Sequence, residues 1–207
     1  MRYINEFLNL KCSSDVLAAC SPIGHNPGKE ISESMGMIKR VKSLIPPNPG
    51  KYNVLDLCAG NALTSVLACH LFKLDYANAV DKKTRSRRWE LVQGFTYLVG
   101  DIYDPNIMNW VNDKTIIISI HACGNLAKRI IEIYKTSNVK AMFLMPCCLG
   151  KLDHGYPEEI KKRLGSYLMF CWDLAQSVEN SKIYIDPYIL SPKNVIIKAI
   201  RGEKVVD

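Results

Sequence analysis

The sequence predicts an α/β fold in which a mostly parallel sheet carries helices on both faces and ends in an antiparallel hairpin. From Tyr52 onward, short apolar runs alternate with stretches of helical spacing, the pattern of repeated strand-helix units around a parallel sheet. Near the end of the chain, two β-rich runs flank the break Ser191-Pro192-Lys193 and indicate a hairpin. A hydrophobic content of 48% in 207 residues suffices for one substantial core, so we expect one structural unit.

Each element is predicted from its own residues. Apolar runs predict strands at 53–57, 76–80, 97–99, 115–120 and 141–145, and helical spacing predicts helices that begin at Ala62, Thr84, Asn125 and Pro157. Residues 182–190 and 194–201 are the two expected hairpin strands. The alternation of strands and helices favours parallel pairing among the first five strands.

Residues 30–44 predict a helix that precedes this series. Apolar side chains recur there near helical spacing, which indicates an amphipathic helix leaning on the main domain: Ile31, Met35, Ile38, Val41 and Leu44. The segment 46–50, PPNPG, stops the helix. We therefore expect an N-terminal helical cap over 1–50 and a main domain over 51–207, together forming one unit. The first 29 residues carry no clear pattern.

Composition narrows the classes of protein. No apolar run reaches the roughly 18 to 20 residues of a membrane span, and the start lacks the layout of a secretory signal, so we expect a cytoplasmic protein without a membrane partner. The eight cysteines are then expected to be reduced, and Cys58, Cys69, Cys147 and Cys148 to be packing residues in apolar surroundings. The formal charge of +7 suits a nucleic-acid partner, although a solvated basic face explains it equally well.

The segment VLDLCAGNALTSVLACHLF carries the first candidate site. It predicts a strand ending in Asp56, then a turn of small residues and a helix, and the turn residues are Cys58, Ala59, Gly60 and Asn61. Small residues let the backbone approach a nucleoside, and N–H groups at a helix start bind polar ligand atoms, but packing alone also produces such turns. The turn does not fit NAD, because the pyrophosphate needs the second and third glycines of the dinucleotide pattern.

Two further acids follow later strands. Asp81, followed by Lys82, ends the second apolar run, where a carboxylate can accept hydrogen bonds from both hydroxyls of a ribose. Asp101, followed by Ile102, comes after the third run and would face an adenine edge. Acids at three successive strand ends favour a nucleoside-containing cofactor over packing alone.

These segments resemble a known family. DLCAGNALTS, AVDKK and GDI are similar to motifs one to three of class I S-adenosylmethionine methyltransferases. The resemblance covers most of residues 30–201 and implies a Rossmann-like, seven-stranded sheet that binds S-adenosylmethionine. The implied cofactor residues are Asp56, Cys58, Ala59, Gly60, Asn61, Asp81, Lys82, Asp101, Ile102 and His121.

A finer resemblance lies after the fourth and fifth strands. SIHACGNL at 119–126 and MPCCLG at 145–150 resemble the HxCG and CC signatures of the methyltransferase family that includes eukaryotic tRNA ribose 2′-O-methyltransferases. This sequence departs from that family at Cys58 and Ala62, where glycines are common, and it lacks recognisable zinc-finger segments at its start. The resemblance implies methyl transfer more strongly than it implies any one acceptor.

His121 is the candidate catalytic residue. At the end of the fourth strand it can act as a general base near neutral pH, although a structural histidine is the alternative. With Cys123, Cys147 and Cys148 it offers the ligand types of a zinc site. We expect no metal, because extended neighbours such as Cys147 and Cys148 point to opposite sides and no CxxC pair is present.

The run KKTRSRRW at 82–89 is the candidate substrate-binding segment. Arg85, Arg87 and Arg88 could grip phosphates and Trp89 could stack on a base, whereas an exposed helix start is the alternative. The leading hypothesis is therefore an S-adenosylmethionine-dependent methyltransferase acting on RNA, with a tRNA ribose hydroxyl as one acceptor. A protein or small-molecule methyltransferase and a non-catalytic cofactor-binding or adaptor domain are the alternatives. The sequence leaves the oligomeric state open.

Overall fold

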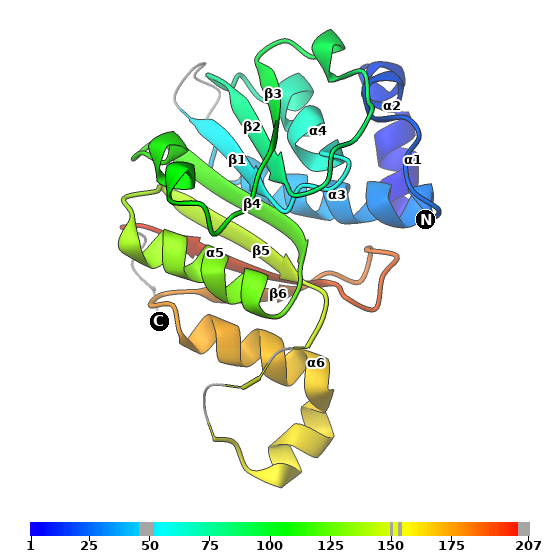
Figure 1. Cartoon of the computed structure of the whole chain (residues 1–207). Coiled ribbons are helices and arrows are strands. Elements are labelled where there is room, and N and C mark those ends of the chain that lie inside the picture. The colour runs from blue at the N-terminus through cyan, green and yellow to red at the C-terminus, as the bar shows by residue number, and fades with distance from the viewer. Residues whose placement is uncertain (46–51, 150, 153–154, 203–207) are drawn as a thin grey trace.

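A seven-stranded sheet forms the centre of the molecule. The structure is a computed structural model that describes residues 1–45, 52–149, 151–152 and 155–202. Its strands are β1 (Asn53–Leu57), β2 (Ala77–Asp81), β3 (Phe95–Val99), β4 (Thr115–Ala122), β5 (Ala141–Pro146), β6 (Lys182–Ile185) and β7 (Val195–Ile200). They lie in the order β3-β2-β1-β4-β5-β7-β6 (Figure 1). The first five pair in parallel, and β7 is antiparallel to both β5 and β6. The predicted α/β fold is confirmed.

Helices cover both faces of this sheet (Figure 1). One face carries α1 (Arg2–Leu8), α2 (Ser13–Cys20), α3 (Pro27–Lys42) and α4 (Leu63–Leu71), and the other carries α5 (Asn125–Thr136) and α6 (Glu158–Gln176). Short 3-10 helices lie at Trp89–Leu91 and Pro105–Trp110. Among the described residues, no helix is both long and apolar enough to span a membrane.

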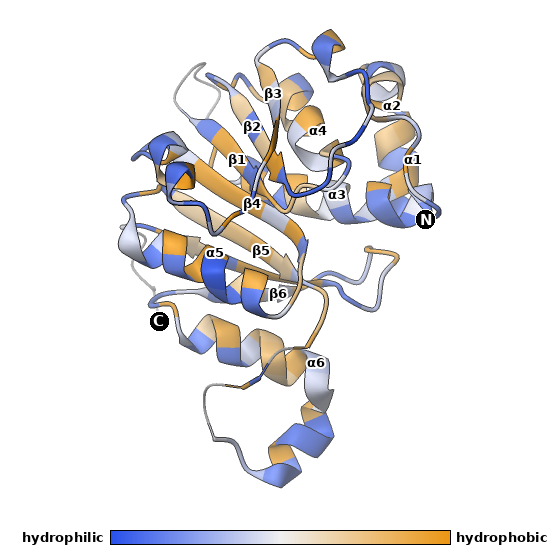
Figure 2. Cartoon of the chain, viewed as in Figure 1, coloured by the Kyte–Doolittle hydropathy of each residue, from blue (hydrophilic) through white to orange (hydrophobic). Residues whose placement is uncertain are grey.

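The sheet contributes side chains to a hydrophobic core on each of its faces, because successive side chains of a strand point to opposite faces. On β5, Phe143 belongs to the core under α1 to α4, and its neighbour Leu144 belongs to the core under α5 and α6. Each such fully buried side chain stabilises the fold by roughly 1.5 to 3 kcal/mol. Figure 2 shows the matching pattern on α5, whose hydrophobic residues face the sheet and whose hydrophilic residues face solvent.

The helix expected at 30–44 exists but begins earlier, at Pro27. The Asn26 side chain accepts a hydrogen bond from the Lys29 N–H at 3.0 Å, and Pro27 occupies the first turn, so the start is capped in the usual way. α3 packs on α4 and reaches β4 and β5, and its residues 31–38 are all buried. The expected stop at 46–50 lies outside the described residues, as does Gly150 of the CC segment.

Two element predictions need correction. No helix begins at Thr84: residues 82–88 are irregular, and Arg85 and Arg87 turn back to the Asn61 side chain and do not follow a helical path. The hairpin pairing is confirmed, but its first strand ends at Ile185 and not at Leu190. The chain turns away there because Asp186 accepts hydrogen bonds from Tyr3 and from the Tyr188 N–H.

Candidate functional site

The turn after β1 is held by left-handed residues. Cys58, Gly60 and Ala62 have φ of 61, 56 and 56°, and the Ala62 N–H donates to the Ala59 carbonyl at 2.8 Å. A left-handed non-glycine residue costs about 1 kcal/mol or more and persists only where its surroundings require it. A Cβ placed on Gly60 would meet nothing within 4 Å. The turn therefore curls around open space at the carboxyl edge of the sheet.

Asp56, predicted among the cofactor residues, lies beneath this turn and lines neither of the two hollows described below. It is 3% exposed and accepts a hydrogen bond from Ser65 Oγ at 2.8 Å. Burial raises the pKa of its carboxyl to about 7. Asp56 thus ties the end of β1 to the first turn of α4.

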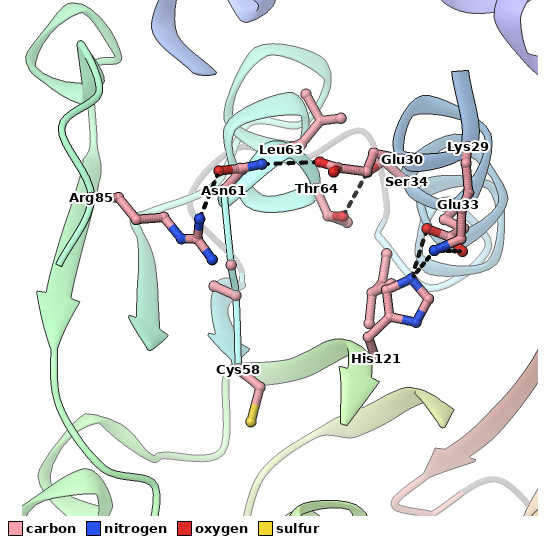
Figure 3. Close-up of a pocket in the computed structure, with 13 residues that line it drawn as sticks. Lys29, Glu30, Glu33, Ser34, Cys58, Asn61, Leu63, Thr64, Arg85 and His121 are labelled. Atoms are coloured by element: carbon pink, nitrogen blue, oxygen red, sulfur yellow. Dashed lines mark hydrogen bonds and ion pairs between the residues drawn. The ribbon is translucent and has the colours of Figure 1, made fainter. Parts of the chain in front are cut away.

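A first hollow of about 620 Å³ opens between α3, the β1 turn and the end of β4 (Figure 3). Its lining includes the predicted residues Cys58, Ala59, Gly60, Asn61, Arg85 and His121. It also includes Lys29, Glu30 and Glu33 from α3, which were not predicted from the sequence. Their signal was the Asn26-Pro27 helix start, since a helix beginning there brings these residues into its first turns.

His121 meets two of these missed residues. Its Nε2 lies 2.9 Å from Glu33 Oε2 and 3.1 Å from Lys29 Nζ, and Lys29 Nζ lies 3.3 Å from Glu33 Oε1. Glu33 is 1% exposed, so its carboxylate is held by these two partners away from water. When Nε2–H donates to Glu33, Nδ1 is the ring nitrogen that can accept a proton. Like Cys58, His121 has a left-handed backbone, with φ of 66°.

Asn61 links the basic run to α3. Its Nδ2 donates to Glu30 Oε2 at 3.0 Å, and its Oδ1 accepts from Arg87 at 2.9 Å and from Arg85 at 3.3 Å. The Nε atoms of both arginines are buried and have no hydrogen-bond partner among the described residues. Arg85 therefore lines the hollow, and Arg87 turns back to Asn61, which also lines it.

The other members of the basic run lie farther out. Arg88 is exposed; its backbone N–H donates to the Ala19 carbonyl, and its own carbonyl accepts from the Leu91 N–H. Trp89 stacks on Tyr97 with ring centroids 3.8 Å apart, so one face of the indole expected to receive a base is already covered. Tyr97 in turn donates to the Gly60 carbonyl at 3.2 Å, which braces the turn from β3.

A second hollow of about 350 Å³ lies on the other side of Cys58. The predicted residues Asp81, Lys82, Asp101 and Ile102 line it, together with Leu126. The Asp81 carboxylate accepts hydrogen bonds from the N–H groups of Gly60 and Lys83, each at 2.9 Å. Lys82 pairs with Asp101 at 2.7 Å and holds the pKa of that exposed carboxyl below its usual value. Cys58 borders both hollows, so they flank one turn.

The cysteines after β4 and β5 are arranged differently from the prediction. Cys123, Cys147 and Cys148 bring their Sγ atoms together, and Cys148 is exposed and so is not a packing residue. The extended geometry assumed for Cys147 and Cys148 does not exist, because β5 ends at Pro146. Burial raises the pKa of Cys147, whereas hydrogen bonds with Cys123 and Cys147 lower that of Cys148.

Comparisons with known proteins agree with this architecture. A family model described as a methyltransferase domain matches residues 28–155, more than half of the chain. A chain of the fibrillarin/Nop5p complex is 20% identical, with a TM-score of 0.53 over 84% of this chain and 82% of that one. An O-methyltransferase candidate from Nostoc punctiforme is 12% identical, with a TM-score of 0.50 over 97% and 70%. At these identities the two structures support the fold alone. No curated protein matches the sequence.

Proposed function

We propose that this chain, which belongs to the methyltransferase domain family, binds S-adenosylmethionine in the two hollows beside Cys58 and transfers its methyl group to RNA. The observation that carries the proposal is the pairing of His121 with the buried Glu33 at the wall of the first hollow. A tRNA ribose hydroxyl is the acceptor that the HxCG and CC segments favour.

The residues of the two hollows suit the two halves of this cofactor. Asp81 and Asp101 offer carboxylate acceptors to a ribose and an adenine amino group, and Ile102 offers an apolar wall to the base. The first hollow offers the buried Arg85 Nε as an unpaired donor for an anionic group. Asp56 acts only by holding the turn in shape. When bound, the cofactor supplies an electrophilic methyl group on a sulfonium.

His121 is the residue we assign to proton removal from the acceptor. A hydroxyl becomes a competent nucleophile when a positioned base takes its proton, which contributes about 10²- to 10⁴-fold. Glu33 fixes the ring through Nε2, leaves Nδ1 to receive that proton, and stabilises the imidazolium that results. Lys29 pairs with the other oxygen of Glu33 and helps to hold its carboxylate against the ring.

An RNA acceptor fits the charges around the first hollow. Lys29 and Arg85 line it, Arg87 approaches it through Asn61, and the exposed Arg88 continues the cationic surface outward. Phosphates of a polymer can contact such a surface while one nucleotide enters the hollow. In this proposal residues 1–50 are the cap that contributes Lys29 and Glu33, and residues 51–207 form the cofactor-binding domain.

Methyl-labelled S-adenosylmethionine tests the acceptor. The wild-type chain and a His121→Ala variant are incubated with total cell extract, and label is counted separately in RNA, protein and small molecules. We expect His121-dependent label in RNA that disappears after ribonuclease treatment. His121-dependent label in protein or in small molecules would show that this fraction, and not RNA, contains the acceptor. If the chain binds the cofactor but transfers label to no fraction, it is a non-catalytic cofactor-binding domain.

A further inference from the structure

Three thiols meet where β4 and β5 end side by side (Figure 1). Cys123 Sγ lies 2.7 Å from Cys147 Sγ and 3.1 Å from Cys148 Sγ, and the latter two are 3.4 Å apart. Cys123 lies in the loop after β4, and Cys147 and Cys148 lie in the loop after β5, 24 and 25 residues later in the sequence. This cluster lies outside the two hollows and has no part in the methyl transfer proposed above.

The backbone brings the thiols together through two unusual residues. The pairing of β4 with β5 shifts register between Ile120 and Ala122, and His121 between them is left-handed. Gly124, with φ of 48°, then starts α5 directly after Cys123. The His121 carbonyl accepts from both Cys123 Sγ and Cys147 Sγ at 3.4 Å. Both loops are thus drawn to the same point.

Neither packing nor a disulfide explains this cluster. Cysteines that only pack are buried, as Cys20 and Cys171 are, whereas Cys148 is exposed. The shortest sulfur separation, 2.7 Å, is well above the roughly 2.05 Å of a disulfide, and one bond would leave the third thiol unused.

We propose that Cys123, Cys147 and Cys148 bind a zinc ion as three thiolates. Sulfurs about 2.3 Å from zinc in a tetrahedron lie roughly 3.8 Å apart, so these thiols need to separate by only about 1 Å or less to admit the ion. Thiolates select soft or borderline ions over magnesium and calcium. Among the described residues no histidine or carboxylate joins the set, so the fourth position faces solvent beside Cys148. The ion fastens the end of β4, where His121 turns, to the end of β5.

Metal content tests this proposal without any assay of methyl transfer. The reduced chain is saturated with zinc, freed of unbound ion and analysed by elemental mass spectrometry. We expect about one zinc ion per chain for the wild type and for Cys69→Ala, whose cysteine lies in α4 far from the cluster in sequence. Cys123→Ser and Cys147→Ser should lose the ion. Cobalt should replace zinc and give the charge-transfer absorption of cobalt thiolates in the wild type and in Cys69→Ala, but not in Cys123→Ser or Cys147→Ser.

Two results would overturn the site. One is a folded, reduced wild-type chain that retains no zinc and gives no cobalt-thiolate absorption. The other is Cys123→Ser binding as much zinc as the wild type. Because the wild-type chain alone decides the first result, misfolding of a variant cannot hide it, and circular dichroism checks each variant.

Discussion

The turns at the ends of β1 and β4 share a left-handed residue but differ in the side chains that they bring together. Cys58 and His121 both turn the chain through a left-handed residue, with φ of 61 and 66°. After β1 the turn is held from below by Ser65, which donates to Asp56, and from the next two strands by Asp81 and Tyr97, which bond to the Gly60 backbone. After β4 the partners come from afar, since Glu33 lies 88 residues before His121. The end of β1 is a turn of small residues that leaves open space beside it. The end of β4 brings together reactive side chains from separate elements.

If the β4 end is the reactive one, His121→Ala should give the largest effect. We expect methyl transfer to fall by about 10²- to 10⁴-fold, because the acceptor loses its base. Affinity for S-adenosylmethionine should change little. The exposed His70→Ala is the control and should retain full activity. Rates with labelled cofactor measure the effect, and a His121→Ala rate close to wild type would remove the base from this end of the sheet.

The β1 end should respond to pH through Asp56. Its pKa is raised to about 7 from the roughly 3.9 of an unfolded chain, so the protonated acid stabilises the fold. That stabilisation is complete below about pH 4 and is lost as the pH rises through about 7. Relative to Asp56→Asn, the wild type should lose up to roughly 4 kcal/mol of unfolding free energy over this range. Urea unfolding at several pH values measures it, and parallel curves for the two chains would contradict the buried carboxyl.

Asp81→Ala probes cofactor binding beside the turn that follows β1. We expect S-adenosylmethionine to bind about 1 to 3 kcal/mol more weakly, or about 5- to 150-fold, because the ribose hydroxyls lose a charged acceptor. Asp113→Ala, at an exposed turn, should bind as the wild type does. Calorimetry measures both affinities. Unchanged affinity in folded Asp81→Ala would move the cofactor away from the second hollow.

The smallest effect is expected outside the hollows, at Arg88. Arg88→Gln should flatten the dependence of RNA affinity on salt by roughly 0.7 to 0.9 in log-log slope, the effect of one lost phosphate contact. Arg163→Gln, at an exposed position of α6 before Gly165, is the matched control. Filter binding across salt concentrations measures both slopes. Equal slopes for the wild type and Arg88→Gln would remove this arginine from the RNA surface.

The same contrast explains what the sequence could predict. The five parallel strands, the hairpin and the small-residue turn depend on local periodicity and residue size, and all are present. The inward path of Arg85 depends on Asn61, and the thiol cluster depends on two strands ending side by side. The Arg85 contact leaves no local pattern, whereas the three cysteines follow two predicted strands and were recognisable as a possible ligand set, although not as an assembled one. The burial of Asp56 under the turn could not be predicted either, because a strand-end acid is equally compatible with contact to a ligand and with such burial.

A crystal structure with S-adenosylhomocysteine would place the cofactor product directly. We expect the ribose at Asp81, the adenine between Asp101 and Ile102, and the sulfur in the first hollow on the side of His121. A product bound elsewhere on the chain, or absent from both hollows at saturating concentration, would contradict this placement.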